Sequence, residues 1–425
     1  MTSRPVLLVF SHLRWGFVYQ RPQHLLSRLA RRWQVLFVEE PVLCEGPAWL
    51  DAQTRENGIT LLVPHTPVSV PGFHDDQVAV LQSLVAGWLQ KQRLEVDVTW
   101  LYTPMALPLV QAAAPGCLVY DCMDELSAFK DAPRQLRQRE SALLKNAALV
   151  LTGGPSLYEA KRDRNDNVVC LPSAVDAAHY APAGLVAGSY HALAAEQLQG
   201  ALPGPRLGYF GVVDERLDLT LVTAAADAHP EWSLVMAGPV VKIAPDSLPQ
   251  RANIHWLGMQ PYARLPHLLA GWDVSLMPFA LNEHTRFISP TKTLEYMAGE
   301  KPVVSTAVRD VISLYGEGVV VADVVNNGAQ AFVQACEQLL AESATERTSR
   351  ASTMSRLVSQ YSWGRSAERV HSLLMHALER ASASMESEQA DPLTLDAAAL
   401  RQTAPRAPAS VPASARAAAA GGARA

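Results

Sequence analysis

The residues best suited to chemistry open the segment from residue 289 to 305, which reads SPTKTLEYMAGEKPVVS. Ser289 and Pro290 are favourable residues for the N-cap and the first position of a helix. A helix start presents free backbone N–H groups and the positive end of the helix dipole, which favour an anion such as phosphate. Thr291 and Lys292 add a hydroxyl and a cation at the same end. The segment therefore predicts an anion site.

A carboxylate lies on the same predicted helix. Glu295 follows Thr291 by one turn, at the i, i+4 spacing that places two side chains on one face. A carboxylate placed there can accept hydrogen bonds from two vicinal hydroxyls, such as those of a ribose. Gly299 favours the end of the helix, and the β-branched Val303-Val304 indicates a buried parallel strand. These features predict a nucleotide site, although a surface helix with ordinary capping would also explain them.

Length, charge and cysteine content narrow the class of protein. The chain has 425 residues, 49% of them hydrophobic, and a net charge of −5, which indicates two or three domains and argues against a dedicated nucleic-acid binder. Its five cysteines include no CxxC pair and no zinc-like Cys/His cluster, and their odd number favours a reducing compartment. Because no apolar run reaches the ~18 residues of a membrane span, we expect a cytoplasmic protein.

The elements that must position these residues follow an α/β pattern. Short apolar strands alternate with helical segments, which indicates doubly wound parallel sheets. Strands are expected at Val6–Phe10, Val35–Val38, Ile59–Val63, Thr99–Tyr102, Leu118–Asp121, Leu149–Thr152 and Val168–Leu171. A second α/β unit begins at Pro205, with strands expected after Arg206 and at Trp232–Ala237, Ile254–Leu257, Asp273–Met277, Val303–Ser305 and Val319–Ala322.

Ligands of open α/β sheets bind beyond the carboxyl ends of the strands, and two such ends carry polar residues. His12 follows the first strand, and Asp121 ends another strand in the sequence DCMDE. Either residue could act as a general base. Asp121 could equally hold a sugar hydroxyl or cap the next helix. On the helix after the first loop, His24, Arg28 and Arg31 share a face that is either solvated or in contact with an anionic acceptor or membrane.

The segment from residue 289 to 305 resembles the donor-site motif of GT-B glycosyltransferases, S-P-x-K-x-x-E-Y-x-A-x-G-x-P-V-V, as found in retaining family-4-type (group 1) bacterial enzymes. The resemblance implies two Rossmann-like domains facing across a cleft, with a nucleoside-diphosphate sugar on the second. It places the ribose on Glu295 and the diphosphate on residues 289–291 and Lys292. Many retaining members carry a second Glu eight residues earlier, where this chain has Phe287.

Other candidate donor-binding residues lie at strand ends of the second unit. Gly211 would let a ligand approach the backbone closely, and Arg216 could bind a phosphate in a bidentate manner. By resemblance, Gly238 and Gly258 end the strands that form the base and ribose pocket. The full donor-binding set is Gly211, Arg216, Gly238, Gly258, Asn282, Ser289, Pro290, Thr291, Lys292 and Glu295, and the catalytic set is Asp121, His12, Arg216 and Lys292. The D-x-x-D spacing after residue 120 is not the D-x-D metal motif, so no metal site is expected.

The resemblance also implies a domain layout. We expect an acceptor domain at 1–182, a partly helical linker at 183–204, a nucleotide-sugar domain at 205–362, a crossing helix at 363–381 and a disordered tail at 382–425. The HLRW and QRPQH sequences after the first strand are similar to the opening of a bacterial GT-B subgroup. Trp363 is expected to plug the junction where the helix crosses back to the first domain.

The reaction implied is transfer of a hexosyl group from a nucleoside-diphosphate sugar to a hydroxyl of a polysaccharide, oligosaccharide or lipid-linked acceptor, in cell-envelope or exopolysaccharide synthesis. Stabilisation of the leaving diphosphate would carry catalysis, with no further cofactor. A sugar-nucleotide 2-epimerase of the same fold, or a catalytically weak binding or assembly subunit, remains an alternative because of Phe287. No G-x-G-x-x-G follows the first strand, which argues against a dinucleotide oxidoreductase. Arginines near the N-terminus suggest peripheral contact with an anionic membrane.

Overall fold

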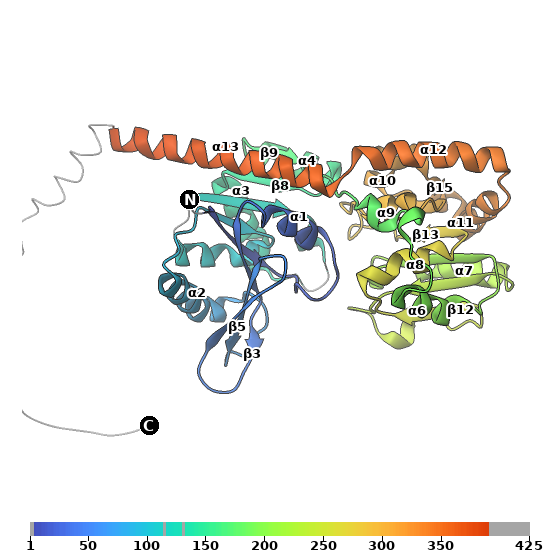
Figure 1. Cartoon of the computed structure of the whole chain (residues 1–425), viewed down its shortest axis with the longest axis horizontal. Coiled ribbons are helices and arrows are strands. Elements are labelled where there is room, and N and C mark those ends of the chain that lie inside the picture. The colour runs from blue at the N-terminus through green and yellow to red at the C-terminus, as the bar shows by residue number, and fades with distance from the viewer. Residues whose placement is uncertain (1–3, 114–115, 130–131, 391–425) are drawn as a thin grey trace, which may run out of the picture. The chain divides into compact units, whose positions relative to one another are not determined.

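The computed structural model describes residues 4–113, 116–129 and 132–390, and these contain two β-sheets (Figure 1). The first sheet has nine strands in the order β3-β5-β2-β1-β6-β7-β8-β9, with β4 antiparallel to β5. The other pairs of this sheet are parallel. Its strands are β1 (Val6–Ser11), β2 (Gln34–Glu39), β3 (Val42–Leu43), β4 (Trp49–Thr54), β5 (Thr60–Thr66), β6 (Val98–Leu101), β7 (Cys117–Cys122), β8 (Leu149–Thr152) and β9 (Val168–Cys170).

The second sheet has six parallel strands in the order β12-β11-β10-β13-β14-β15. They are β10 (Arg206–Phe210), β11 (Ser233–Ala237), β12 (Ile254–Gly258), β13 (Val274–Met277), β14 (Val303–Thr306) and β15 (Val320–Ala322). Phe210 lies beside Ala237, so the glycines that follow β10 and β11 are neighbours. We call the parts built on the two sheets the first and the second domain.

Thirteen α-helices connect the strands within the described ranges. They are α1 (Arg21–Leu29), α2 (Val78–Gln92), α3 (Gln135–Asn146), α4 (Pro155–Lys161), α5 (Ala177–Tyr180), α6 (Tyr190–Gln199), α7 (Leu219–Ala228), α8 (Leu265–Ala270), α9 (Lys292–Ala298), α10 (Arg309–Tyr315), α11 (Val324–Leu340), α12 (Ala344–Gln360) and α13 (Trp363–Ala390). Both sheets with their helices belong to one compact unit that ends at Glu379. The chain therefore has the α/β fold class that the sequence predicted.

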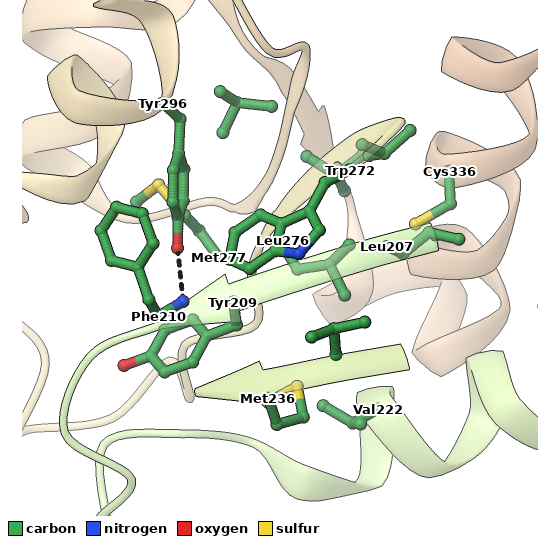
Figure 2. Packing of buried hydrophobic residues seen from close by; sticks show 14 of the residues in the cluster. Leu207, Tyr209, Phe210, Val222, Met236, Trp272, Leu276, Met277, Tyr296 and Cys336 are labelled. Atoms are coloured by element: carbon green, nitrogen blue, oxygen red, sulfur yellow. Dashed lines mark hydrogen bonds between the residues drawn. The ribbon is translucent and has the colours of Figure 1, made fainter. Parts of the chain in front are cut away.

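Burial explains why the predicted strands read as continuous apolar runs. All six residues of β1 are buried, because helices cover both faces of a parallel sheet. In the second domain, Leu207, Trp272 and Tyr296 are almost fully buried in one hydrophobic cluster. Figure 2 shows this cluster, with the Phe210 N–H donating to the Tyr296 hydroxyl at 3.0 Å. That bond ties the end of β10 to helix α9, the element that carries the predicted nucleotide-binding residues.

The last helix returns to the first domain, as the resemblance implied. Trp363 is 1% exposed and belongs to a core cluster of the first domain, together with Ala367, Val370, Leu374 and Ala377. The Trp363 ring stacks on His24 at 4.8 Å between ring centroids. Helix α13 continues to Ala390, beyond residue 382 where the tail was expected to begin. Residues 391–425 of that expected tail lie outside the described residues.

Strands β3 and β4 and helix α12 were not expected from the sequence. Strands β3 and β4 lie between residues 42 and 54, where exposed residues give no apolar run. Helix α12 fills residues 344–360, just before the helix that was expected from residue 363. Helix α6 lies within the segment expected to be a partly helical linker, and its Gln199 accepts a hydrogen bond from the Trp272 indole in the second domain. No helix among the described residues is long and apolar enough to cross a membrane.

Candidate nucleotide-sugar site

A cavity of about 600 Å³ lies at the carboxyl ends of the strands of both sheets. Loops that follow strands form its wall, as expected for ligand sites of open α/β sheets. The first domain contributes residues 15–21, Met123, Asp124, Gly153 and Ser173. The second domain contributes Tyr209, Phe210, Gly211, Val212, Arg216, Ala237, Gly238, Pro239, Met259, Gln260, Pro261, Tyr262, Leu265, Phe279, Ile288, Ser289, Pro290, Thr291, Lys292 and Glu295. Eight of the ten predicted donor-binding residues thus meet in one cavity.

Two glycines make room at the centre of this wall. Gly211 and Gly238 have φ angles of 142° and 150°, which L-residues rarely adopt. A Cβ on Gly238 would lie 1.7 Å from the Gly211 carbonyl oxygen, and a Cβ on Gly211 would lie 2.1 Å from Cε of Lys292. Their N–H groups donate to Ala237 and Gly258 carbonyls at 2.9 and 2.8 Å. Gly211 therefore leaves room for the Lys292 side chain and Gly238 leaves room for the Gly211 backbone, and the amides of both glycines are occupied within the protein.

Two cations face this space. The Lys292 ammonium lies 5.7 Å from the centre of the Tyr209 ring and 5.9 Å from that of Phe279. Burial, assisted by the neighbouring Arg216 charge, lowers the pKa of Lys292 to about 8. Arg216 is held by Asp214, to whose carboxylate its Nε donates at 3.0 Å and its Nη2 at 2.7 Å. A lysine and an oriented guanidinium on one wall form a suitable site for a diphosphate.

Glu295 lies on α9 one turn after Lys292 and also lines the cavity. Burial raises the pKa of its carboxyl to about 7, although the nearby Lys292 charge opposes this shift. The structure thus places a hydrogen-bond acceptor close to the two cations, at the position that the sequence proposed for a ribose.

The start of α9 differs from the expectation. The helix begins at Lys292, with Thr291 at the N-cap position, instead of at Pro290 after a Ser289 cap. The Thr291 carbonyl accepts the first helical bonds, from Leu294 and Glu295 N–H at 3.0 and 3.2 Å. Ser289 packs against Gly154 of the first domain, where a Cβ would lie 2.8 Å from the Cβ of Ser289. Ser289 Oγ is buried without a hydrogen-bond partner among the described residues.

The proposed bases lie away from the cavity wall. Asp121 is fully buried and accepts hydrogen bonds from the Arg21 guanidinium at 2.9 to 3.1 Å. Arg21 also donates to the Leu171 carbonyl at 2.8 Å, so this pair fixes α1 to the sheet. His12 is absent from the lining, and burial, with the Lys242 charge, lowers the pKa of its imidazole to about 4.

Asp124 is the carboxylate that reaches the cavity from this loop. Burial raises its pKa, while the charge of Arg216 across the cavity opposes that shift. Strand β7 ends at Cys122, so Asp121 lies within the strand and Asp124 lies beyond its end. The rule that ligands bind beyond strand ends therefore applies to Asp124 as well, whereas the sequence interpretation named Asp121 of the cluster.

Two further candidates for the donor site lie outside the cavity lining. Asn282 accepts the His284 N–H on its side-chain oxygen at 2.9 Å and so stabilises a local turn. Gly258, with φ of 63°, supplies its carbonyl to Gly238. Phe287, at the position of the family's second Glu, packs against a core cluster of the first domain.

The predicted cationic face of α1 is largely occupied by contacts within the chain. His24 is 3% exposed and lies among aromatic rings instead of on a solvated face. Arg28 pairs with Asp176 at 3.0 Å. In the preceding loop, Arg14 pairs with Glu39 at 2.9 Å. Across the described ranges, no cluster of three or more His, Cys, Asp or Glu residues could hold a metal ion.

Comparisons with known proteins match the part of the chain that carries this site. A family model described as Glycosyl transferases group 1 matches residues 204–342, which include both glycines, Arg216, Lys292 and Glu295. The protein TuaH of Bacillus subtilis (strain 168), named as a teichuronic acid biosynthesis glycosyltransferase, is 27% identical over 152 residues. These residues make up 35% of this chain and 38% of TuaH, so the match spans well under half of that relative.

Solved structures resemble nearly the whole chain. Sucrose-phosphate synthase from Thermosynechococcus elongatus has a TM-score of 0.66 at 16% identity, over 89% of this chain and 100% of that chain. The Anabaena protein HepE, solved in complex with UDP and glucose, has a TM-score of 0.63 at 15% identity, over 88% and 100% of the two chains. At these identities the likeness shows the fold alone.

The fold that these structures share with the chain defines the class: the chain has the GT-B fold. More particularly, residues 204–342 match the Glycosyl transferases group 1 family, the family that the motif at residues 289–305 predicted. The predicted fold class is therefore confirmed, and the predicted family is matched over these residues.

Proposed function

We propose that the chain transfers a hexosyl group from a nucleoside-diphosphate sugar to a hydroxyl of a saccharide or lipid-linked acceptor. One observation carries this proposal: Lys292, Arg216 and Glu295 meet in one cavity of about 600 Å³, beside the space left by two glycines. In this proposal the cations hold the diphosphate and Glu295 accepts hydrogen bonds from the ribose. TuaH, whose name places it in teichuronic acid biosynthesis, supports a role in cell-envelope or exopolysaccharide synthesis.

The chemistry follows from the charge that develops during transfer. When the sugar leaves, negative charge grows on the diphosphate, and fixed cations in a water-poor site stabilise that charge. Lys292 has its pKa lowered to about 8, so most of it is protonated at pH 7, and an anionic ligand would favour the charged form further. In this proposal Lys292 and Arg216 are the side chains that stabilise the charge of the leaving diphosphate. Asp124 lines the same cavity from the first domain, and in this proposal it is the candidate to contact the acceptor.

We do not extend the proposal to a membrane surface. Five arginines near the N-terminus suggested such contact, namely Arg14, Arg21, Arg28, Arg31 and Arg32. All of them except Arg31 lie in ion pairs among the described residues.

The test is a thermal-shift measurement with UDP-, GDP-, ADP- and dTDP-sugars, on the wild type and Glu295→Gln side by side. A ligand that binds the native state raises the melting temperature. We expect one donor class to raise it by several degrees in the wild type and far less in the variant. Glu300→Gln, an exposed carboxylate just past the end of the same helix, is the matched control. Absence of any shift in folded wild-type protein would contradict the donor site.

Turnover separates transfer from the two alternatives. Transfer requires an added acceptor and yields a glycosylated product. An epimerase would release free nucleoside diphosphate and an altered sugar without any acceptor, and an assembly subunit would bind the donor with no turnover at all.

A further inference from the structure

Two tyrosine hydroxyls next to the cavity are buried without a hydrogen-bond partner among the described residues. Tyr180 ends helix α5 and is 1% exposed, and Tyr262 lies after β12 and lines the cavity. A hydroxyl that is removed from water without a hydrogen bond lowers the stability of the folded protein. A phenylalanine would avoid this cost and keep the ring, so the hydroxyl of a buried tyrosine needs an explanation other than packing.

The Tyr180 ring is held firmly beside the cavity. It stacks on Phe210 with ring centroids 6.0 Å apart, and it meets Tyr262 edge-on at the same distance. His179, the preceding residue of α5, stacks on Tyr262 at 4.1 Å, and its Nε2 lies 3.2 Å from the Tyr262 carbonyl oxygen. Because α5 also packs against α9, the phenol is fixed relative to the helix that carries Glu295.

The charged group next to the Tyr180 hydroxyl is the Glu295 carboxyl. Burial raises the pKa of Tyr180, and the charge of Glu295 raises it further. Burial likewise raises the pKa of Glu295 to about 7, while the Lys292 charge and the Tyr180 hydroxyl oppose that shift. The hydroxyl therefore lies close enough to favour the ionised carboxylate, although it does not complete a hydrogen bond of ordinary geometry.

The other titratable groups around Glu295 are already engaged or act less directly. Lys292, on the same helix, is the cation proposed for the diphosphate. Tyr296 follows Glu295 in the chain, and its hydroxyl accepts the Phe210 N–H at 3.0 Å. The charge of Glu295 also raises the pKa of Tyr262, after the larger effect of burial. Of these phenols, Tyr180 is the one whose hydroxyl lowers the pKa of Glu295.

We propose that Tyr180 is a positioning residue, whose hydroxyl donates to the Glu295 carboxylate when a donor binds and holds it ionised and oriented toward the ribose. The inference rests on the proposed function and deepens it, because it names a residue that controls the ribose contact. Each carboxylate oxygen has two lone pairs, so one oxygen can accept from Tyr180 and from a ribose hydroxyl together. Without the phenol hydroxyl, the carboxyl would take up a proton at higher pH and would turn more freely.

Calorimetric titration of the full chain with UDP, GDP and ADP from pH 5.5 to 8.5 tests this role. Because the ionised Glu295 is the form that binds, wild-type affinity should be full above about pH 7 and should fall below it. In Tyr180→Phe the pH at which affinity falls should rise by about half a unit to one unit. At pH 7 the variant should bind about twofold to fivefold more weakly. Comparison with the wild type at each pH cancels the titration of the nucleotide's own phosphate.

The ribose contact is tested with the 2′-deoxy form of the nucleotide that binds most tightly. This probe lacks one of the two hydroxyls that Glu295 is proposed to accept, so Tyr180→Phe should weaken its binding less than that of the ribonucleotide. Glu295→Gln removes the titrating carboxyl. Adding Tyr180→Phe to Glu295→Gln should therefore leave the pH profile where it was.

Tyr315→Phe is the matched control. Tyr315 belongs to the same hydrophobic cluster as Tyr180, its hydroxyl is also buried without a partner in the described part of the chain, and it does not line the cavity. Its pH profile should equal that of the wild type. Both phenylalanine variants lose only an unpaired hydroxyl, so both should melt within a few degrees of the wild type.

Several outcomes would overturn the role of Tyr180 while the donor site stands. They are an unchanged pH profile in Tyr180→Phe, an equal loss of affinity for the ribonucleotide and its 2′-deoxy form, and a pH shift that persists in the Glu295→Gln background. A Tyr180→Phe protein that melts far below the wild type would assign the hydroxyl to structure and would also overturn the role. Failure of all three nucleotides to bind the folded wild type would instead reject the donor site on which the inference rests.

Discussion

At the scale of single residues, the wall of the cavity that carries Lys292, Arg216 and Glu295, called the donor wall below, lowers the stability of the empty protein. Burial raises the pKa of Glu295 to about 7 and lowers that of Lys292 to about 8, so each buried group favours its neutral form. A site that must bind a charged ligand keeps two ionisable groups where water cannot fully solvate them. We therefore expect removal of the Glu295 charge to stabilise the empty protein while it impairs binding.

The stability prediction for Glu295→Gln depends on pH. The folded-state pKa of Glu295 lies above its ordinary 4.5, so the wild type loses stability as pH rises from about 4.5 to about 7. Over that pH range the free energy of unfolding of the variant should rise relative to that of the wild type, by at most about 3 kcal/mol at pH 8. Urea unfolding at pH 4.5 and pH 8 measures the difference, with Glu300→Gln as control. An equal effect of Glu295→Gln on the free energy of unfolding at both pH values would contradict the raised pKa of Glu295.

The two aspartates after residue 120 should behave in opposite ways. Asp121→Asn leaves the buried Arg21 charge without its partner, which we expect to cost about 3 kcal/mol of unfolding free energy. Asp124→Asn breaks no side-chain hydrogen bond among the described residues and should change stability by less than about 1 kcal/mol, while it lowers acceptor turnover. Urea unfolding and a transfer assay on both variants check this. A stable Asp121→Asn protein with reduced turnover would return the catalytic role to Asp121.

At the scale of elements, the loops after β10 and β11 shape the donor wall through close backbone contact. The close approach of Gly238 to the Gly211 carbonyl leaves no room for a side chain. Gly258 at the end of β12 also has positive φ, but a Cβ there would meet no atom within 4 Å. Comparing substitutions at Gly238 and at Gly258 therefore separates the effect of steric crowding from that of backbone strain.

We expect Gly238→Ala to cost at least about 2 kcal/mol and to abolish donor binding, because the β10 loop must move away from Lys292. Gly258→Ala should cost about 1 kcal/mol, the strain of a left-handed residue, and should retain binding. Urea unfolding and the donor thermal shift measure both. Equal losses of unfolding free energy in the two variants would contradict the close contact between the Gly211 and Gly238 loops.

The same elements show what the sequence could predict. Buried parallel strands are continuous apolar runs, so β1 and β8 were placed within about one residue of their observed bounds. Lys292 and Glu295 share a local motif, and Gly211 and Arg216 follow such a strand, so the sequence could propose all four for the site. Strand β4 was missed because it is exposed and pairs antiparallel at the sheet's side. The Arg21–Asp121 pair joins residues 100 positions apart, and no local pattern predicts such a partner.

At the scale of the whole molecule, the two domains also meet outside the cavity. Asp310 on α10 of the second domain accepts the Ser156 N–H at 3.0 Å, and so caps the start of α4 in the first domain. Gly154 at the N-cap of α4 has no side chain to fill that role. Arg309 adds an ion pair with Glu159 on the same helix at 2.6 Å. One domain thus completes a helix of the other.

This contact gives a prediction for hydrogen exchange. Asp310→Ala should leave the first amides of α4 without an acceptor, at a cost of about 0.5–2 kcal/mol. Exchange over residues 153–161 should accelerate several-fold. Asp310→Asn keeps a side-chain oxygen and should exchange much like the wild type. Faster exchange spread over the whole protein would instead indicate general destabilisation.

Helix α13 has a consequence for biosynthesis. Trp363 and the following apolar residues of α13 fill the core of a domain whose first strand begins at Val6. During synthesis the ribosome completes strand β1 first and helix α13 last, with the entire second domain between them. The first domain therefore cannot complete its core during translation until nearly all of the described chain has emerged. The second domain can finish folding first, against the usual order in which the N-terminal domain leads.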